Sequence, residues 1–126
     1  MSNIPKELKY TKDHEWVKID GDIATVGITD YAQKELTDVV FVELPEIGKT
    51  IEKEKNMANV ESVKSVSDIF APITGEIIEI NEKLTDAPET INSDCYGKGW
   101  IAKVKIKDIT ELDSLMNAEE YKKIIE

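Results

Sequence analysis

Most of this chain is divided into short segments in which apolar and polar residues alternate, each followed by residues that favour a turn. The segments at 14–19 and 23–28 flank Asp20-Gly21-Asp22, which predicts a hairpin with an Asp-Gly turn. Further segments of strand length lie at 39–42, 57–62, 66–70, 76–80 and 100–106, and the last should pair with an earlier strand. This succession predicts a mainly β fold.

Helical spacing occurs in two places. Thr29-Asp30 can cap a short internal helix over residues 31–36. Apolar residues then recur at helical spacing from 112 to 125, where Asn117 and Glu120 are placed as a capping box. We therefore expect C-terminal helices that close a mostly β chain.

The length favours one folding unit. A chain of 126 residues is too short for two comfortable cores, so we expect a single domain over 1–126 with a C-terminal helical cap at about 108–126. Apolar residues make up 40% of the chain, and six glycines bring that share to the level usual in folded proteins. Disorder is therefore not expected, although 33% of the residues are charged.

The charge balance restricts the partners. Sixteen basic residues, all lysines, stand against 26 acidic ones, so the net charge is −10. An acidic chain without arginine is poorly suited to phosphate backbones, base edges or anionic membranes. No window has the roughly 18 apolar residues that span a bilayer, and the N-terminus lacks the features of a signal or Arg-rich presequence. We expect no nucleic acid, no membrane and a cytoplasmic location.

The residues for most catalytic chemistry are missing. Cys95 and His14 are the only cysteine and histidine, which excludes an intrachain disulfide and leaves too few ligands for a zinc cage. The carboxylates show no calcium-loop spacing, and there is no phosphate-binding glycine loop or nucleophile elbow. We therefore expect neither an enzyme nor a metal site.

The most informative residue is Lys64. It stands midway between two expected strands, among small and β-branched residues, with no other base within eight positions. Strands that pair about Val63-Lys64 would place the amine at a hairpin tip, although neither residue favours a turn. An exposed lysine amine is suited to amide modification. From composition alone, an ordinary surface lysine is the alternative.

The segment around this lysine is similar to a known family. Glu61-Ser62-Val63-Lys64-Ser65, followed by Ser67-Asp68 and residues 71–76, resembles the lipoylation region of glycine cleavage system H proteins. Residues 14–17, 27–33, 40–48 and 91–100 resemble other hallmark stretches of that family, in unbroken order from about Leu8 to the C-terminus. Cys95 departs from the pattern at a position where proline is usual, which concerns the rigidity of one loop.

The resemblance implies a biotinyl/lipoyl-attachment β sandwich (barrel-sandwich hybrid) and one lipoate in amide linkage to Lys64. It also implies a carrier that takes the aminomethyl group of glycine from glycine decarboxylase to aminomethyltransferase and electrons to dihydrolipoamide dehydrogenase. A lipoate ligase or lipoyltransferase would attach the cofactor. The carrier would contribute no catalytic residue, and we expect a monomer.

In the resembling family the loaded arm docks near positions that match Glu15 and Asp68. A carboxylate there can hold a protonated amine by a charge-assisted hydrogen bond. The alternative for both is an ordinary solvated acid at the end of a strand. His14 and Trp16 are expected to be structural, because a β-barrel edge commonly buries such residues.

Other functions remain open at this point. An H-like protein that relays lipoyl groups to other apoproteins would have the same fold. A biotin carrier is disfavoured, because its lysine usually stands between methionines whereas Lys64 stands between Val63 and Ser65. A β-rich adaptor without a prosthetic group is a further alternative.

Overall fold

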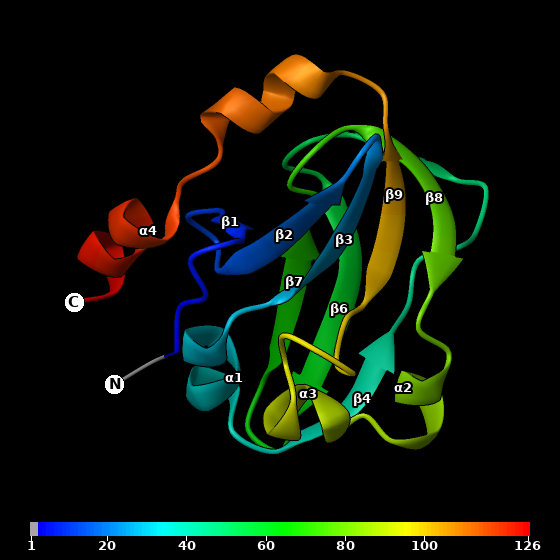
Figure 1. Cartoon of the computed structure of the whole chain (residues 1–126). Coiled ribbons are helices and arrows are strands. Elements are labelled where there is room, and N and C mark those ends of the chain that lie inside the picture. Colours follow the sequence, from blue (N-terminus) through cyan, green and yellow to red (C-terminus); the bar gives the residue numbers. More distant parts are fainter. Residues whose placement is uncertain (1–2) are drawn as a thin grey trace.

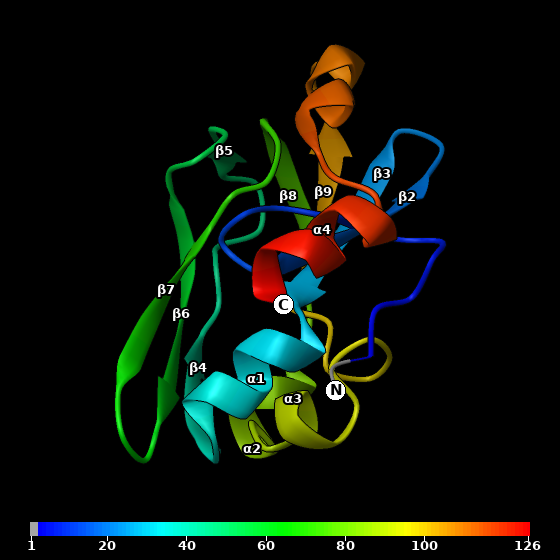
Figure 2. The same cartoon turned by 90° about the vertical axis from the view of Figure 1, so that its left-hand side faces the viewer.

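The strands form two antiparallel sheets that pack face to face (Figures 1 and 2). The structure is a computed structural model that describes residues 3–126. The larger sheet has the order β1 (Lys9–Tyr10), β2 (Glu15–Asp20), β3 (Ile23–Ile28), β9 (Ala102–Ile106), β8 (Gly75–Ile80) and β5 (Thr50–Ile51). The smaller sheet has the order β4 (Val39–Glu43), β6 (Asn56–Ser62) and β7 (Val66–Phe70). The predicted mainly β sandwich is confirmed.

The principal core lies between the two sheets. Val26, Ile77 and Val104 of the larger sheet are fully buried in one cluster with Val60 and Ile69 of the smaller sheet. Alternation places these side chains on the inner faces and leaves polar residues outside. The predicted hairpin pairs Asp20 with Ile23, and the turn between them has Gly21 at a φ of +64°.

The helices are short, with four to eight residues each. They are α1 (Asp30–Leu36), α2 (Lys83–Asp86), α3 (Thr90–Ser93), the 3₁₀ helix η1 (Ile109–Ser114) and α4 (Ala118–Ile125). Figure 1 shows α1, α2 and α3 at the same end as the β6–β7 turn. The Thr29 cap and the capping box of Asn117 and Glu120 are both formed as predicted. Within residues 3–126 no helix is long and apolar enough to cross a membrane.

A second buried cluster attaches the C-terminal helix to the N-terminal strands. The rings of Tyr10 and Tyr121 stack with centroids 4.8 Å apart, and Trp16 is buried beside them. The indole Nε1–H of Trp16 donates to the Cys95 carbonyl oxygen at 2.9 Å. The C-terminal segment therefore packs against the chain's own beginning.

Gly27 should be intolerant of a side chain, because it pairs with Trp16 across β2 and β3. A Cβ at position 27 would stand 2.6 Å from three atoms of the indole. Gly27→Ala should lower the free energy of unfolding by about 1–3 kcal/mol, measured by urea denaturation. In a Trp16→Phe background the penalty should shrink, because the smaller ring lacks part of the obstructing indole. Equal penalties in both backgrounds would contradict the steric cause.

Candidate functional site

Lys64 lies at the tip of the β6–β7 hairpin, as predicted. Glu61 and Val66 are the last paired residues, and the Ser62 N–H donates to the Ser65 carbonyl oxygen at 2.8 Å. The Ser62 hydroxyl oxygen accepts from the backbone N–H groups of Lys64 at 3.3 Å and Ser65 at 3.1 Å. This serine therefore stabilises a turn that has no glycine, asparagine or aspartate at its tip.

The tip is also held from the side. The Val63 N–H donates to the Asp38 carbonyl oxygen at 3.0 Å, which ties the turn to the residue that precedes β4. The Lys64 side chain itself is exposed. A backbone fixed on both sides thus presents an accessible primary amine.

A cavity of about 350 Å³ begins beside this turn, and we call it the tip cavity. Residues 65–67 and Ile69 form one wall, and α1 forms the opposite wall through Tyr31, Ala32, Glu35 and Leu36. Ile28, Asp13 and His14 complete the lining. From Ser65 to Ile69 the strand covers about 13 Å, so the cavity extends well away from the tip.

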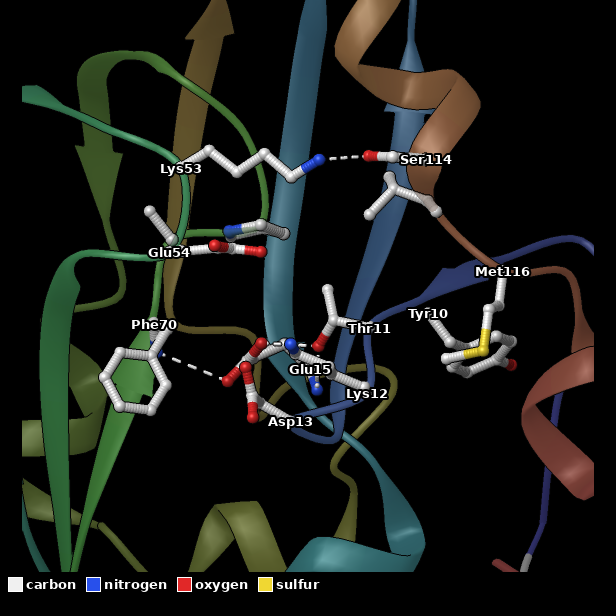
Figure 3. A pocket seen from close by; sticks show the side chains of 13 residues that line it. Tyr10, Thr11, Lys12, Asp13, Glu15, Lys53, Glu54, Phe70, Ser114 and Met116 are labelled. Carbon is white, nitrogen blue, oxygen red and sulfur yellow. Dashed lines mark hydrogen bonds between the residues drawn. The ribbon is translucent and has the colours of Figure 1, made fainter. Parts of the chain in front are cut away.

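A second cavity, of about 240 Å³, adjoins the first through Asp13, which lines both. We call it the Glu15 cavity (Figure 3). Its wall is formed by Tyr10, Thr11, Lys12, Asp13, Glu15, Lys53, Glu54, Phe70, Ala71, Pro72, Ser114, Leu115 and Met116. The start of β2, the end of β7 and the segment after η1 therefore meet around one carboxylate.

That carboxylate, on Glu15, is almost completely buried, with 1% of the residue exposed. One oxygen, Oε1, accepts from the Thr11 hydroxyl at 2.5 Å, and Oε2 accepts from the Phe70 N–H at 3.2 Å (Figure 3). Burial raises the pKa of Glu15 to about 7, although both hydrogen bonds act in the opposite direction. Glu15 therefore changes charge near neutral pH.

The backbone before Glu15 is held by α4. His14 has a φ of 71°, which is unfavourable for a residue with a side chain. The Tyr121 hydroxyl lies 2.8 Å from His14 Nδ1 and 2.7 Å from Thr29 Oγ1, and the Thr29 N–H donates to the His14 carbonyl oxygen at 3.0 Å. Burial lowers the pKa of His14, which favours the neutral ring. His14 therefore has the structural role that the sequence predicted.

Asp68 is placed differently from Glu15. It is exposed on β7, paired with Asn59 of β6, and lines neither cavity. The structure thus puts Glu15, but not Asp68, in the wall of a cavity next to the hairpin. The docking role of both carboxylates stays a prediction. Thr11 and Tyr121 were not predicted as site residues. Tyr121 reaches the site from more than 100 residues away in the sequence.

Cys95 and the acidic residues form no further reactive centre in the described part of the chain. Residues 3–126 contain no group of three or more His, Cys, Asp or Glu side chains that could hold a metal ion. Cys95 is buried, and burial raises the pKa of its thiol to about 12. This thiol is protonated at neutral pH and is a weak nucleophile.

The raised pKa of Glu15 predicts a specific pH dependence of stability. The folded chain binds this proton more tightly than the unfolded chain, whose carboxyl has the ordinary pKa of 4.5. The stabilisation by the protonated form is complete below about pH 4.5 and is lost as the pH rises through 7. The free energy of unfolding of the natural chain should thus fall by about 3 kcal/mol relative to Glu15→Gln between pH 4 and 8.

Urea denaturation at several pH values measures this difference. Glu119→Gln, which removes an exposed acid on α4, is the control and should show no comparable trend. Parallel pH curves for the natural chain and Glu15→Gln would contradict the raised pKa.

Comparison with known proteins agrees with the resemblance seen in the sequence. A family model described as glycine cleavage H-protein matches residues 8–126. The glycine cleavage system H protein of Staphylococcus carnosus is 53% identical over 122 residues, which cover 97% of each chain. The protein of the same name from Pseudoalteromonas translucida is 55% identical over 127 residues, covering 100% of this chain and 98% of that one.

A solved structure gives the same result at the level of the fold. The crystal structure of a glycine cleavage system H protein from Mycobacterium marinum superposes with a TM-score of 0.86 at 43% sequence identity. The match covers 94% of this chain and 95% of that chain. The chain therefore belongs to the glycine cleavage H-protein family, the carriers of covalently attached lipoate in the glycine cleavage system.

Proposed function

We propose that the whole chain, 1–126, acts as one monomeric carrier domain in the cytoplasm, with a single lipoate in amide linkage to Lys64. It takes the aminomethyl group from glycine decarboxylase to aminomethyltransferase and passes electrons to dihydrolipoamide dehydrogenase. A lipoate ligase or lipoyltransferase attaches the cofactor. The chain holds and protects its cargo and contributes no catalytic residue. The observation that carries this proposal is the exposed Lys64 on a fixed hairpin tip, directly beside a cavity.

The residues around the tip fit such a group. Acylation removes the charge of the Lys64 amine and adds a long, largely apolar arm. The tip cavity begins at Ser65 and offers Ile28, Leu36 and Ile69 along its length. Bound lipoate supplies a disulfide whose sulfur accepts the carried group when the disulfide is reduced. A flexible arm of this kind raises the effective concentration of that sulfur at each partner in turn.

The far end of the tip cavity suits a positively charged cargo. Asp13 lines both cavities, and Glu15 lies in the wall of the second one. A protonated amine placed there favours the ionised form of Glu15, opposing the effect of burial. The resulting charge-assisted hydrogen bond holds the amine, while the apolar walls exclude water. From the family resemblance we also propose that Asp68 contacts the cargo, although it is exposed on β7 and lines neither cavity.

Lys64 should be the one lysine of the sixteen that accepts lipoate. The natural chain, incubated with lipoate ligase, lipoate and ATP, should gain the mass of one lipoyl group, and peptide mapping should place it at Lys64. Lys64→Arg should gain none, because arginine keeps the charge but is no acyl acceptor. A lipoyl group on another lysine, or on the arginine variant, would refute the assignment.

Glu15→Gln and Asp68→Asn should each shorten the lifetime of the carried aminomethyl group without affecting lipoylation. Each hydrogen bond to the amine is worth about 1.5–3 kcal/mol when desolvated, and half of that corresponds to a change of about tenfold or less. Each variant is loaded enzymatically, the decarboxylase is removed, and release of formaldehyde and ammonia is followed.

Glu119→Gln is the matched control for the loss of one negative charge. Its lifetime should equal that of the natural chain. If both single variants and the double variant also match it, the two carboxylates do not hold the cargo, and apolar burial alone would account for any protection.

A further inference from the structure

The exposed apolar side chains of this protein are concentrated around Lys64. Seven large apolar residues in the described chain are exposed: Val40, Phe41, Ile47, Val63, Val66, Ile109 and Ile124. Four of these, Val40, Phe41, Val63 and Val66, lie on the hairpin tip or the adjacent strand, and between 49% and 66% of each is exposed. We call these four residues the apolar collar. Exposed apolar side chains that gather on one part of a surface mark interaction sites.

Strand register explains why the collar faces outward. Phe41 pairs with Glu61, and Glu61 pairs with Val66, so the three form one row across the smaller sheet. Val42 and Val60, the residues next to Phe41 and Glu61 along their strands, are buried, which assigns this row to the outer face.

An irregularity in β4 adds a further apolar residue to the row. The register shifts between Val39 and Phe41, and Val40 is the extra residue. Bulges of this kind redirect a side chain, and here Val40 is 51% exposed. Because the Val63 N–H donates to the Asp38 carbonyl oxygen, the hairpin tip and the start of β4 are held together. The collar is therefore a fixed surface beside the modified lysine.

Acidic residues border the collar. Glu61 lies between the collar residues Phe41 and Val66. The next row along the sheet contains Glu43 and Asp68, on either side of Asn59. The Asn59 Nδ2–H donates to Glu43 Oε1 at 3.0 Å, which orders that carboxylate. Since the whole chain carries a net charge of −10, a complementary partner would present an apolar patch bordered by lysine or arginine.

We propose that the apolar collar is the docking surface for the enzyme that acylates Lys64, and that this enzyme contacts it through an apolar patch with a basic border. The proposal rests on the proposed function, which makes Lys64 the acceptor. It adds the residues that the acylating enzyme recognises.

The reach of the lysine selects this partner among the enzymes of the proposed function. In acylation the amine Nζ gives up a proton to the enzyme and attacks the carbonyl carbon of an activated lipoyl donor. A C–N bond forms, the bond from that carbon to the leaving group breaks, and Nζ loses its second proton. The reacting atoms must come within about 3–3.5 Å of each other. Before acylation, the amine extends from the hairpin tip only by the length of the lysine side chain. The acylating enzyme must therefore cover the hairpin tip, whereas enzymes that act on the attached cofactor meet its far end.

The test compares rates of acylation by a purified lipoate ligase with lipoate and ATP, followed by intact mass. Phe41→Ser and Val40→Ser remove collar side chains that lie outside both cavities. Each should lower kcat/KM about tenfold, mainly through a higher KM, because exposed anchor residues contribute binding energy. Ile47→Ser and Ile109→Ser are controls with 59% and 62% exposure elsewhere on the surface, and each should stay within about twofold of the natural chain.

A charge series tests the basic border of the partner. Phe41→Lys should be acylated more slowly than Phe41→Glu, because the lysine would face like charges. Thermal unfolding of every variant checks that the comparison is made between folded chains. The reverse order of the two rates would overturn the proposed partner chemistry.

Two further outcomes would overturn the docking proposal. One is that the collar variants and the controls are acylated at equal rates. The other is that collar variants are acylated normally but react slowly with glycine decarboxylase, which would give the surface to a different partner. Failure of the natural chain to become acylated at Lys64 would instead refute the proposed function, so the two failures are distinguishable.

Discussion

The buried carboxylate of Glu15 connects the two sheets at the point where function is expected. It belongs to β2 of the larger sheet, yet it accepts a hydrogen bond from the Phe70 N–H of β7 in the smaller sheet. A polar group at 1% exposure needs such partners, because an unpaired buried carboxylate is costly. The two hydrogen bonds satisfy only part of its accepting capacity, which leaves it able to receive a further donor.

The rest of the site is arranged so that Glu15 keeps this position. His14 holds a backbone conformation that a side chain disfavours, and its ring is fixed by the Tyr121 hydroxyl. The same hydroxyl contacts Thr29, which caps the helix that walls the tip cavity. The Tyr121 hydroxyl on α4 therefore contacts both the residue before Glu15 and the N-cap of α1, the helix that walls the tip cavity. The C-terminal helix is thus part of the site, although its residues line neither cavity.

Much of this architecture could be predicted from local sequence. Alternation, the Asp-Gly turn, the Thr29 cap and the Asn117 capping box each depend on a few neighbouring residues. The two-residue strands β1 and β5 and the four-residue helices α2 and α3 were not predicted, because segments of that length have no period to detect. The hairpin tip was placed by its flanking strands, and the Ser62 hydroxyl that stabilises it is not a usual turn signal.

The site was less predictable than the fold because it depends on contacts between distant segments. The contact between His14 and Tyr121 spans 107 positions, and the bond from Phe70 to Glu15 spans 55. The family resemblance pointed to Glu15 and Asp68, but not to the difference in burial that separates them. Glu15 is enclosed and has a pKa of about 7, whereas Asp68 is exposed. Two carboxylates that the sequence treats alike thus acquire different chemistry from their surroundings.

The two faces of one hairpin explain how a small chain can serve several enzymes. Side chains on successive strand residues point to opposite faces, so Ser67 and Ile69 line the tip cavity while Asp68 lies outside. Phe41 of the collar lies on the outer face and lines neither cavity, although Val66 contributes to both the collar and the tip cavity. An arm folded into the cavity would therefore leave most of the collar uncovered. The proposed docking surface and the proposed site for the cargo thus use mostly different side chains of the same hairpin, with Val66 common to both.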